Sequence, residues 1–195
     1  MVRNIEGSKH KAPNEWDTKT KTYDDQPGTE PTNKTNVDDP VVGTNYEANW
    51  TVNQTPTDNT IAISNGGWVV TANNDGIEVY NSANQLAYFD FWTDFVSDPT
   101  LTGSLYDPKV IYDSESDRCI LILLHSSDPS TSKVLVCFSQ SNDPSQGWWL
   151  YQLNGNVLNN GTWFDYPNVG VSNSDVFVSG NLYVVLHAKK EKTEL

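Results

Sequence analysis

Short apolar runs alternate with polar turn residues through residues 46–186 of this chain. Three segments each hold an apolar run, a polar turn and a second apolar run: 58–73, 107–124 and 165–181. Period-two alternation bounded by Asn, Asp, Ser and Gly predicts β-hairpins. Further strands are expected over 76–80, 85–89, 133–139 and 148–153, with a short helix as an alternative for 92–96. The pattern predicts an all-β fold.

The three hairpin segments resemble one another. Residues 61–73 and 169–181 align without a gap, and 107–124 fits the same outline with a turn two residues longer. The residues that open the hairpins, Asp58, Asp107 and Asp165, follow one another at intervals of 49 and 58 residues. A period near about 50 residues with several strands per unit is typical of β-propeller blades. About 140 folded residues make two to three blades, whereas closed propellers have about four to eight, so we predict an incomplete propeller.

Composition divides the chain into three parts. Residues 1–45 mix both charges with almost no periodic apolar positions, which predicts a disordered or linker segment. Residues 46–186 form the predicted partial propeller, and 187–195 are a charged tail. Because this tail stands where a further blade would continue, we expect truncation rather than self-assembly of partial rings. The remaining blades of a parent protein are then the expected partners.

The formal net charge is −13, and residues 46–188 carry only Lys109, Arg118 and Lys133 against fifteen Asp and Glu. Such a surface repels phosphate backbones, so nucleic-acid binding is not expected. It suits an exported protein or divalent cations held at carboxylates. No apolar stretch reaches the length of a membrane-spanning helix, and the first residues lack the pattern of a signal peptide.

Cys119 and Cys137 are the only cysteines, and both lie in apolar runs. Their surroundings favour two buried thiols. The alternative is one disulfide between neighbouring strands, whose register the sequence does not decide.

Three motifs resemble segments of large secreted β-propeller proteins of Bacteroidetes type. The run 106–113 (YDPKVIYD) resembles their blade openings, and 137–151 (CFSQSNDPSQGWWLY) and 163–171 (WFDYPNVGV) add to the likeness. The resemblance covers about residues 46–186 and implies an all-β, exported or cell-surface protein, often with a C-terminal sorting domain. It implies no catalytic residue. Neither a signal nor a sorting domain is recognised within residues 1–195, so we expect both to belong to the parent protein.

Asp58, Asp107 and Asp165 are the first candidate site residues. A short polar side chain at the start of a strand often only bonds the neighbouring backbone, and recurrence in every unit favours this architectural role. In the alternative, the three carboxylates converge at the mouth of a central channel. There they would hold a cation such as Ca²⁺ or contact a sugar, because carboxylates supply hard oxygen ligands.

Aromatic residues are the second group of candidates. The rings of Trp148 and Trp149 point to opposite faces of a strand, so at most one enters a given core. Trp149 could form a sugar-stacking platform with Trp163 or Tyr166, although packing between blades also explains these rings.

The sequence lacks a nucleophile elbow, a phosphate loop and a zinc-protease motif. We therefore predict an exported or cell-surface propeller domain that acts as a scaffold or binds glycan or protein. The alternative is a propeller glycoside hydrolase or lyase with part of its site in missing blades.

Overall fold

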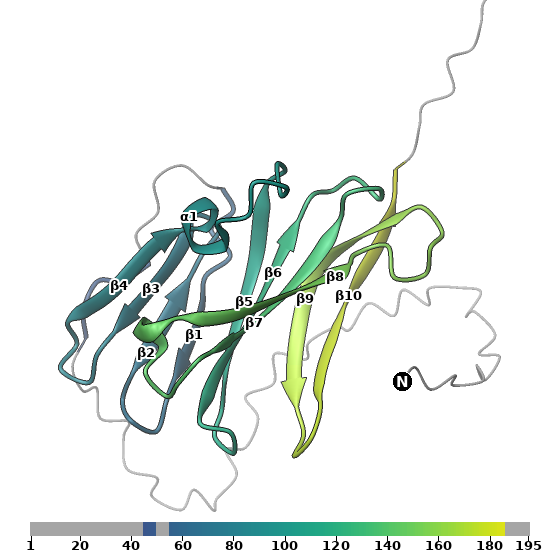
Figure 1. Ribbon diagram of the computed structural model, residues 1–195. Coiled ribbons are helices and arrows are strands. Elements are labelled where there is room, and N and C mark those ends of the chain that lie inside the picture. The colour runs from purple at the N-terminus through teal and green to yellow at the C-terminus, as the bar shows by residue number, and fades with distance from the viewer. Residues whose placement is uncertain (1–44, 50–54, 186–195) are drawn as a thin grey trace, which may run out of the picture. The chain divides into compact units, whose positions relative to one another are not determined.

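The computed structural model describes residues 45–49 and 55–185. Contacts divide the chain into two units, Met1–Gly43 and Thr44–Leu195, and every described residue belongs to the second. The predictions for residues 1–45 and 187–195 fall almost entirely outside the described residues. The all-β prediction is confirmed: ten strands form three antiparallel sheets in the described part (Figure 1).

The first two sheets each contain four strands in chain order. The first consists of β1 (Thr60–Ile63), β2 (Val69–Ala72), β3 (Gly76–Tyr80) and β4 (Leu86–Phe91). The second consists of β5 (Leu105–Asp113), β6 (Arg118–His125), β7 (Lys133–Ser139) and β8 (Trp148–Asn154). The third sheet pairs β9 (Thr162–Val171) with β10 (Val176–Val184). Every strand expected from the alternation is present, because the period and the turn residues are both local signals.

Two short helical segments interrupt the strands. The helical alternative for residues 92–96 is confirmed as α1 (Trp92–Val96), which ends at Ser97 in the left-handed conformation. A 3₁₀ turn (Pro144–Gln146) separates β7 from β8, and the Asp143 side chain accepts a hydrogen bond from the Ser145 N–H at its start. In the described residues no helix is long and apolar enough to cross a membrane.

The gap-free alignment of the first and third hairpins is wrong by one residue in the second strand. Ile61 pairs with Thr71 across the first hairpin, ten positions away, whereas Val169 pairs with Val178, nine positions away. The turn of the third hairpin is therefore one residue shorter. A one-residue shift reverses the face that each side chain occupies, so side chains of the second strand of this hairpin lie on the opposite face from the one the alignment predicts.

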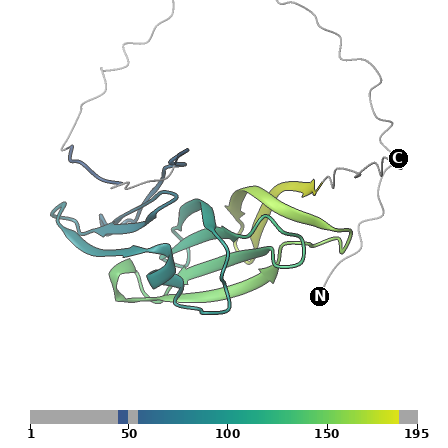
Figure 2. The ribbon, with the colours of Figure 1, turned by 90° about the horizontal axis from the view of Figure 1, so that it is seen from above.

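The sheets follow one another in chain order, as the view from above shows (Figure 2). β1 and β2 contact β5, and β5 and β6 contact β9. Side chains join the sheets as well: Thr60 Oγ1 accepts the Val110 N–H at 3.2 Å, and Ser132 Oγ accepts the Phe164 N–H at 3.3 Å. The first strands of the three sheets thus lie in sequence across the folded unit.

Two apolar cores hold the sheets together. β6 is buried on both faces, because Leu121 and Leu123 pack toward the first sheet while Ile120 and Ile122 pack toward the third. A continuous apolar run is typical of a strand buried on both sides. Burying each such side chain stabilises the fold by about 1.5–3 kcal/mol.

Both cysteines are free and buried in the first of these cores. Cys137 pairs with Leu121 on β6, so Cys119 lies two residues along the neighbouring strand. The prediction of two buried thiols is confirmed, and burial raises the pKa of each thiol to about 12.

Candidate functional site

The structure brings Asp58, Asp107 and Asp165 together. Asp58 lies just before β1, Asp107 lies in β5 and Asp165 lies in β9. The Asp107 carboxyl is within hydrogen-bonding reach of the carboxyls of both Asp58 and Asp165. We call these three residues the carboxyl cluster. The three carboxyls are thus close enough to influence one another's pKa, and their place at the mouth of a channel and their role in binding a ligand stay predictions.

Backbone conformation shows how the cluster forms. Asp58 and Asp107 both adopt the left-handed conformation, with φ of 49° and 52°, three residues before Ile61 and Val110 respectively. Asp tolerates this conformation better than most residues, because its short side chain bonds the local backbone. In the third sheet the residue with this conformation is Tyr166 (φ 50°), three residues before Val169. The expectation that Asp165 holds the corresponding position is wrong by one residue.

Asn74 connects the cluster to the first sheet. Its Nδ2 donates to Asp58 Oδ2 at 2.8 Å and to the Pro56 carbonyl at 2.9 Å. Its Oδ1 accepts the Asp107 N–H at 2.8 Å. The Asn74 amide thus bonds both the Asp58 carboxylate and the Asp107 backbone. The sequence signal for this residue was only an Asn at the end of a strand, which gives no hint of a contact 33 positions away.

The third sheet is attached in the same way. Asp107 Oδ2 accepts the Tyr166 N–H at 3.0 Å. The Tyr106 hydroxyl donates to the Phe164 carbonyl at 3.3 Å from the β5 side. Both Asp58 and Asp107 thus bond the surrounding structure: the bond that Asp107 accepts joins the second and third sheets, and the bond that Asp58 accepts lies within the first.

Burial and mutual repulsion raise the pKa of two of the three carboxyls. Burial raises the pKa of Asp107, and the neighbouring Asp165 and Asp58 carboxylates raise it further. Burial also raises the pKa of Asp165. Like charges close together disfavour the ionised form of each carboxyl. Asp107, with a carboxylate neighbour on each side, is the one whose pKa both neighbours raise.

Tyr106 responds to the same surroundings. Burial raises the pKa of its hydroxyl, and the Asp165 and Asp107 carboxylates add to the effect. The hydroxyl is thus a neutral hydrogen-bond donor beside the cluster at physiological pH.

The aromatic candidates are distributed over different strands. Tyr166 lies beside the cluster with 56% of its surface exposed, and Lys109 Nζ sits 5.2 Å from its ring centroid. Trp163 instead contacts Tyr183, with ring centroids 5.4 Å apart. Trp149 is exposed on β8, the strand of the second sheet farthest in pairing order from β5. Of the three predicted aromatic residues, Tyr166 is the one with a hydrogen bond to the cluster, through its N–H, while Trp163 lies two residues before Asp165 on β9.

Metal binding receives no geometric support. Within residues 45–49 and 55–185, no three His, Cys, Asp or Glu side chains are grouped so that they could hold a metal ion. The calcium hypothesis stays a prediction.

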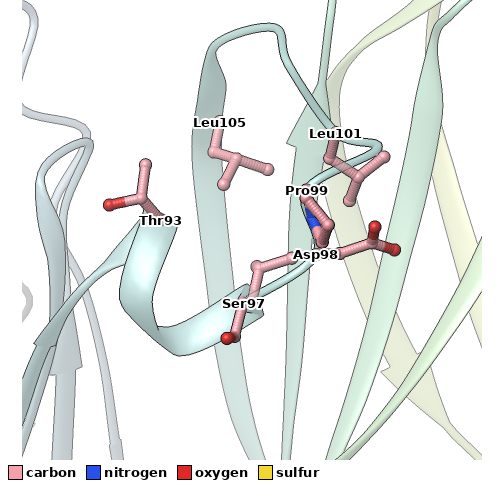
Figure 3. Close-up of a pocket in the computed structure, with 7 residues that line it drawn as sticks. Thr93, Ser97, Asp98, Pro99, Leu101 and Leu105 are labelled. Carbon is pink, nitrogen blue, oxygen red and sulfur yellow. The ribbon is translucent and has the colours of Figure 1, made fainter.

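A separate pocket lies beside α1 and is lined by residues of the segment 93–105 (Figure 3). Its charged residue is Asp98, whose Oδ1 accepts from the Thr100 N–H and hydroxyl while Oδ2 accepts from Gln152 Nε2 at 2.7 Å. The Thr100 bonds and the Gln152 bond lower the pKa of Asp98. Both carboxylate oxygens are already bonded, so Asp98 ties the loop after α1 to β8.

Comparison with protein-family models, curated proteins and solved structures finds no match to this chain.

Proposed function

We propose that the three sheets are consecutive blades of a β-propeller and that this domain binds glycans on the face that carries the carboxyl cluster. The support for the blades is the antiparallel pairing that the three leading hairpins share, although their turns differ in length. Ile61 pairs with Thr71, Val110 with Leu121 and Val169 with Val178, and the first strands lie in sequence across the unit. Propeller blades place their first strands around the central channel.

The observation that carries the glycan proposal is the pairing of the cluster with an exposed ring. Half-buried carboxyls accept hydrogen bonds from sugar hydroxyls, and the face of an aromatic ring packs on the apolar face of a sugar. Tyr166 offers such a ring while its own N–H bonds Asp107. Lys109 adds a mobile donor above the ring. The strongly acidic surface and the likeness to secreted propeller proteins support an exported or cell-surface location.

We favour binding over glycoside hydrolysis because of carboxyl spacing. Hydrolases keep their two carboxyls about 5 Å or more apart, so that the glycosidic bond or a water fits between them. The Asp107 carboxyl instead lies within hydrogen-bonding reach of both neighbouring carboxyls. The raised pKa values of Asp107 and Asp165 are the observation that favours the hydrolase alternative, since a general acid needs a proton at working pH.

Calorimetric titration of the full chain with cellohexaose, maltohexaose and mannohexaose tests the proposal. We expect at least one of these to bind, and Tyr166→Gly to weaken its binding by about tenfold, since stacking on a ring contributes about one kcal/mol or more. Glycine accepts the positive φ of this position, so the variant removes the ring without imposing a new backbone strain.

Trp149→Ala is the matched control. It removes an equally exposed ring from β8, away from the cluster, and we expect unchanged binding. Loss of binding in Trp149→Ala but not in Tyr166→Gly would move the site to β8. Failure of all three oligosaccharides to bind would contradict the glycan proposal, and release of reducing sugar during titration would favour the hydrolase alternative.

A further inference from the structure

The third sheet exposes apolar side chains on the face that points away from the second sheet. Phe177 on β10 is 60% exposed, and Tyr183 and Val185 are exposed as well. Trp163 of β9 lies against Tyr183 on this sheet. Large apolar side chains exposed on one face of a sheet are typical of an interaction surface.

Register identifies Phe177 as a position that is buried in the other two sheets. Each leading hairpin has one residue pair directly beside the pair named above for it. These neighbouring pairs are Val70 with Ala62, Ile120 with Ile111, and Phe177 with Gly170. Val70 and Ile120 are 0% and 1% exposed, because each packs against the following sheet. Phe177 has no following sheet in the described part of the chain.

The first sheet, at the opposite end of the series of sheets, also exposes apolar side chains. Ile61 and Ile63 on β1 are 59% and 60% exposed. The register counterpart of Ile61 in the second sheet is Val110, which is 3% exposed because it packs against the preceding sheet. Residues 45–49 cover another part of the first sheet, where Tyr46 contacts the ring of Tyr80, and leave β1 exposed.

We propose that the third sheet of one copy packs on the first sheet of a second copy, head to tail, with Phe177 against Ile61 and Ile63. The inference rests on the proposed blade arrangement and not on glycan binding. The chain builds this kind of contact twice within itself, between its first and second and between its second and third sheets. The new contact continues that series with residues the chain already carries.

Two observations favour a second copy as the occupant. A Cβ built on Gly170 would have no neighbouring heavy atom within 4 Å. There is therefore room beside Phe177 for a β-branched side chain of another copy. The described part of each copy holds sheets of four, four and two strands, so a pair of copies brings six sheets together, within the range of about four to eight blades of closed propellers. Two identical contacts close such a pair, so association stops at the dimer instead of growing into a filament.

Sedimentation-equilibrium measurements of the full chain test the proposal. We expect a reversible dimer that strengthens as salt screens the net charge of −13 on each copy. Phe177→Asp and Ile61→Asp should each weaken dimerisation by about tenfold or more, because each places a charge in an apolar contact. Leu158→Asp, on the exposed loop between β8 and β9, is the matched control and should dimerise like the original chain.

Mixing the two variants distinguishes the arrangements. A head-to-tail contact leaves one intact interface between a Phe177→Asp copy and an Ile61→Asp copy, so the mixture should form heterodimers that neither variant forms alone. A dimer that Ile61→Asp leaves unchanged would instead join two third sheets and would overturn the proposal. A chain that stays monomeric at millimolar concentration would also overturn it, with other parts of the same chain covering Phe177. Oligosaccharide titration of the same samples reads out the glycan site separately, since neither substitution touches the carboxyl cluster.

Discussion

Asp107→Asn is the most informative single change in this protein. The asparagine keeps an oxygen to accept the Tyr166 N–H and gains two N–H donors for the carboxylates of Asp58 and Asp165. It also tolerates the φ of 52° at this position. The substitution therefore preserves shape and hydrogen bonds while it removes one ionisable group from the cluster.

The expected gain follows from the repulsion that the change removes. Two charges about 4 Å apart repel by about 1 kcal/mol in water and about 4 kcal/mol at an effective dielectric constant of 20. Asp107 is only half-buried, so solvent screening brings the figure toward the lower value. We expect Asp107→Asn to raise the free energy of unfolding at pH 7 by about 1–2 kcal/mol, or Tm by about 3–6 °C.

The gain should depend on pH with a definite sign. The pKa of Asp107 is raised in the folded protein, so its carboxyl stabilises the fold most below the ordinary Asp pKa. This contribution is lost as the pH rises from that value through the raised one. The advantage of Asp107→Asn should therefore be near zero at pH 3.5 and should grow toward pH 7. The lowered pKa values of Asp113 and Asp117 act in the opposite direction, so the difference between variant and original chain is the quantity to measure.

Urea denaturation followed by tryptophan fluorescence, repeated from pH 3.5 to pH 7.5, gives that difference. Asp175→Asn removes the same charge from the exposed turn between β9 and β10 and serves as the control. An Asp107→Asn variant that is destabilised equally at every pH would refute the argument. So would a gain at pH 7 no larger than that of Asp175→Asn.

Three further predictions concern the surrounding structure. Asn74→Ala leaves the Asp107 N–H without its acceptor and should lower the free energy of unfolding by about 1–3 kcal/mol in urea, whereas the exposed Asn59→Ala should change it little. Gly76→Ala places a Cβ 2.2 Å from the Asp90 carbonyl oxygen and should destabilise by about 1–3 kcal/mol, while Gly66→Ala meets only ordinary contacts; equal Tm values for the two would contradict this. Cys119 and Cys137 should resist a thiol reagent at pH 8 until urea unfolds the chain and then both react, and a missing thiol after unfolding would point to a disulfide.

Local signals in the sequence predicted the strands well. Alternation and turn residues placed the hairpins, and even the short helix at Trp92–Val96 was foreseen as an alternative. The register was harder to predict because a turn can lose one residue without a visible mark. The third hairpin lost one, which moved Phe177 rather than Val178 onto the outer face.

The site was predictable only in part. Asp58 and Asp107 could be matched because each is an acidic residue at a recurring position, and their convergence follows from packing the first strands in order. Asn74 and Tyr106 could not be found, because their contacts join sheets that are distant in sequence. Trp149 was grouped with Tyr166 on ring chemistry alone, and strand order separates them.

Carbon-detected NMR titration of the aspartate carboxyls tests the carboxyl cluster most directly. The account predicts that Asp107 and Asp165 titrate above the ordinary Asp range, and that an oligosaccharide that binds shifts both resonances. Asp117, whose pKa is lowered by its bonds to Tyr112 and Asn142, provides an internal comparison on the same spectrum. Titration of Asp107 and Asp165 at or below the ordinary value would show that the neighbouring carboxyls and burial do not disfavour their ionised forms, and would contradict the account.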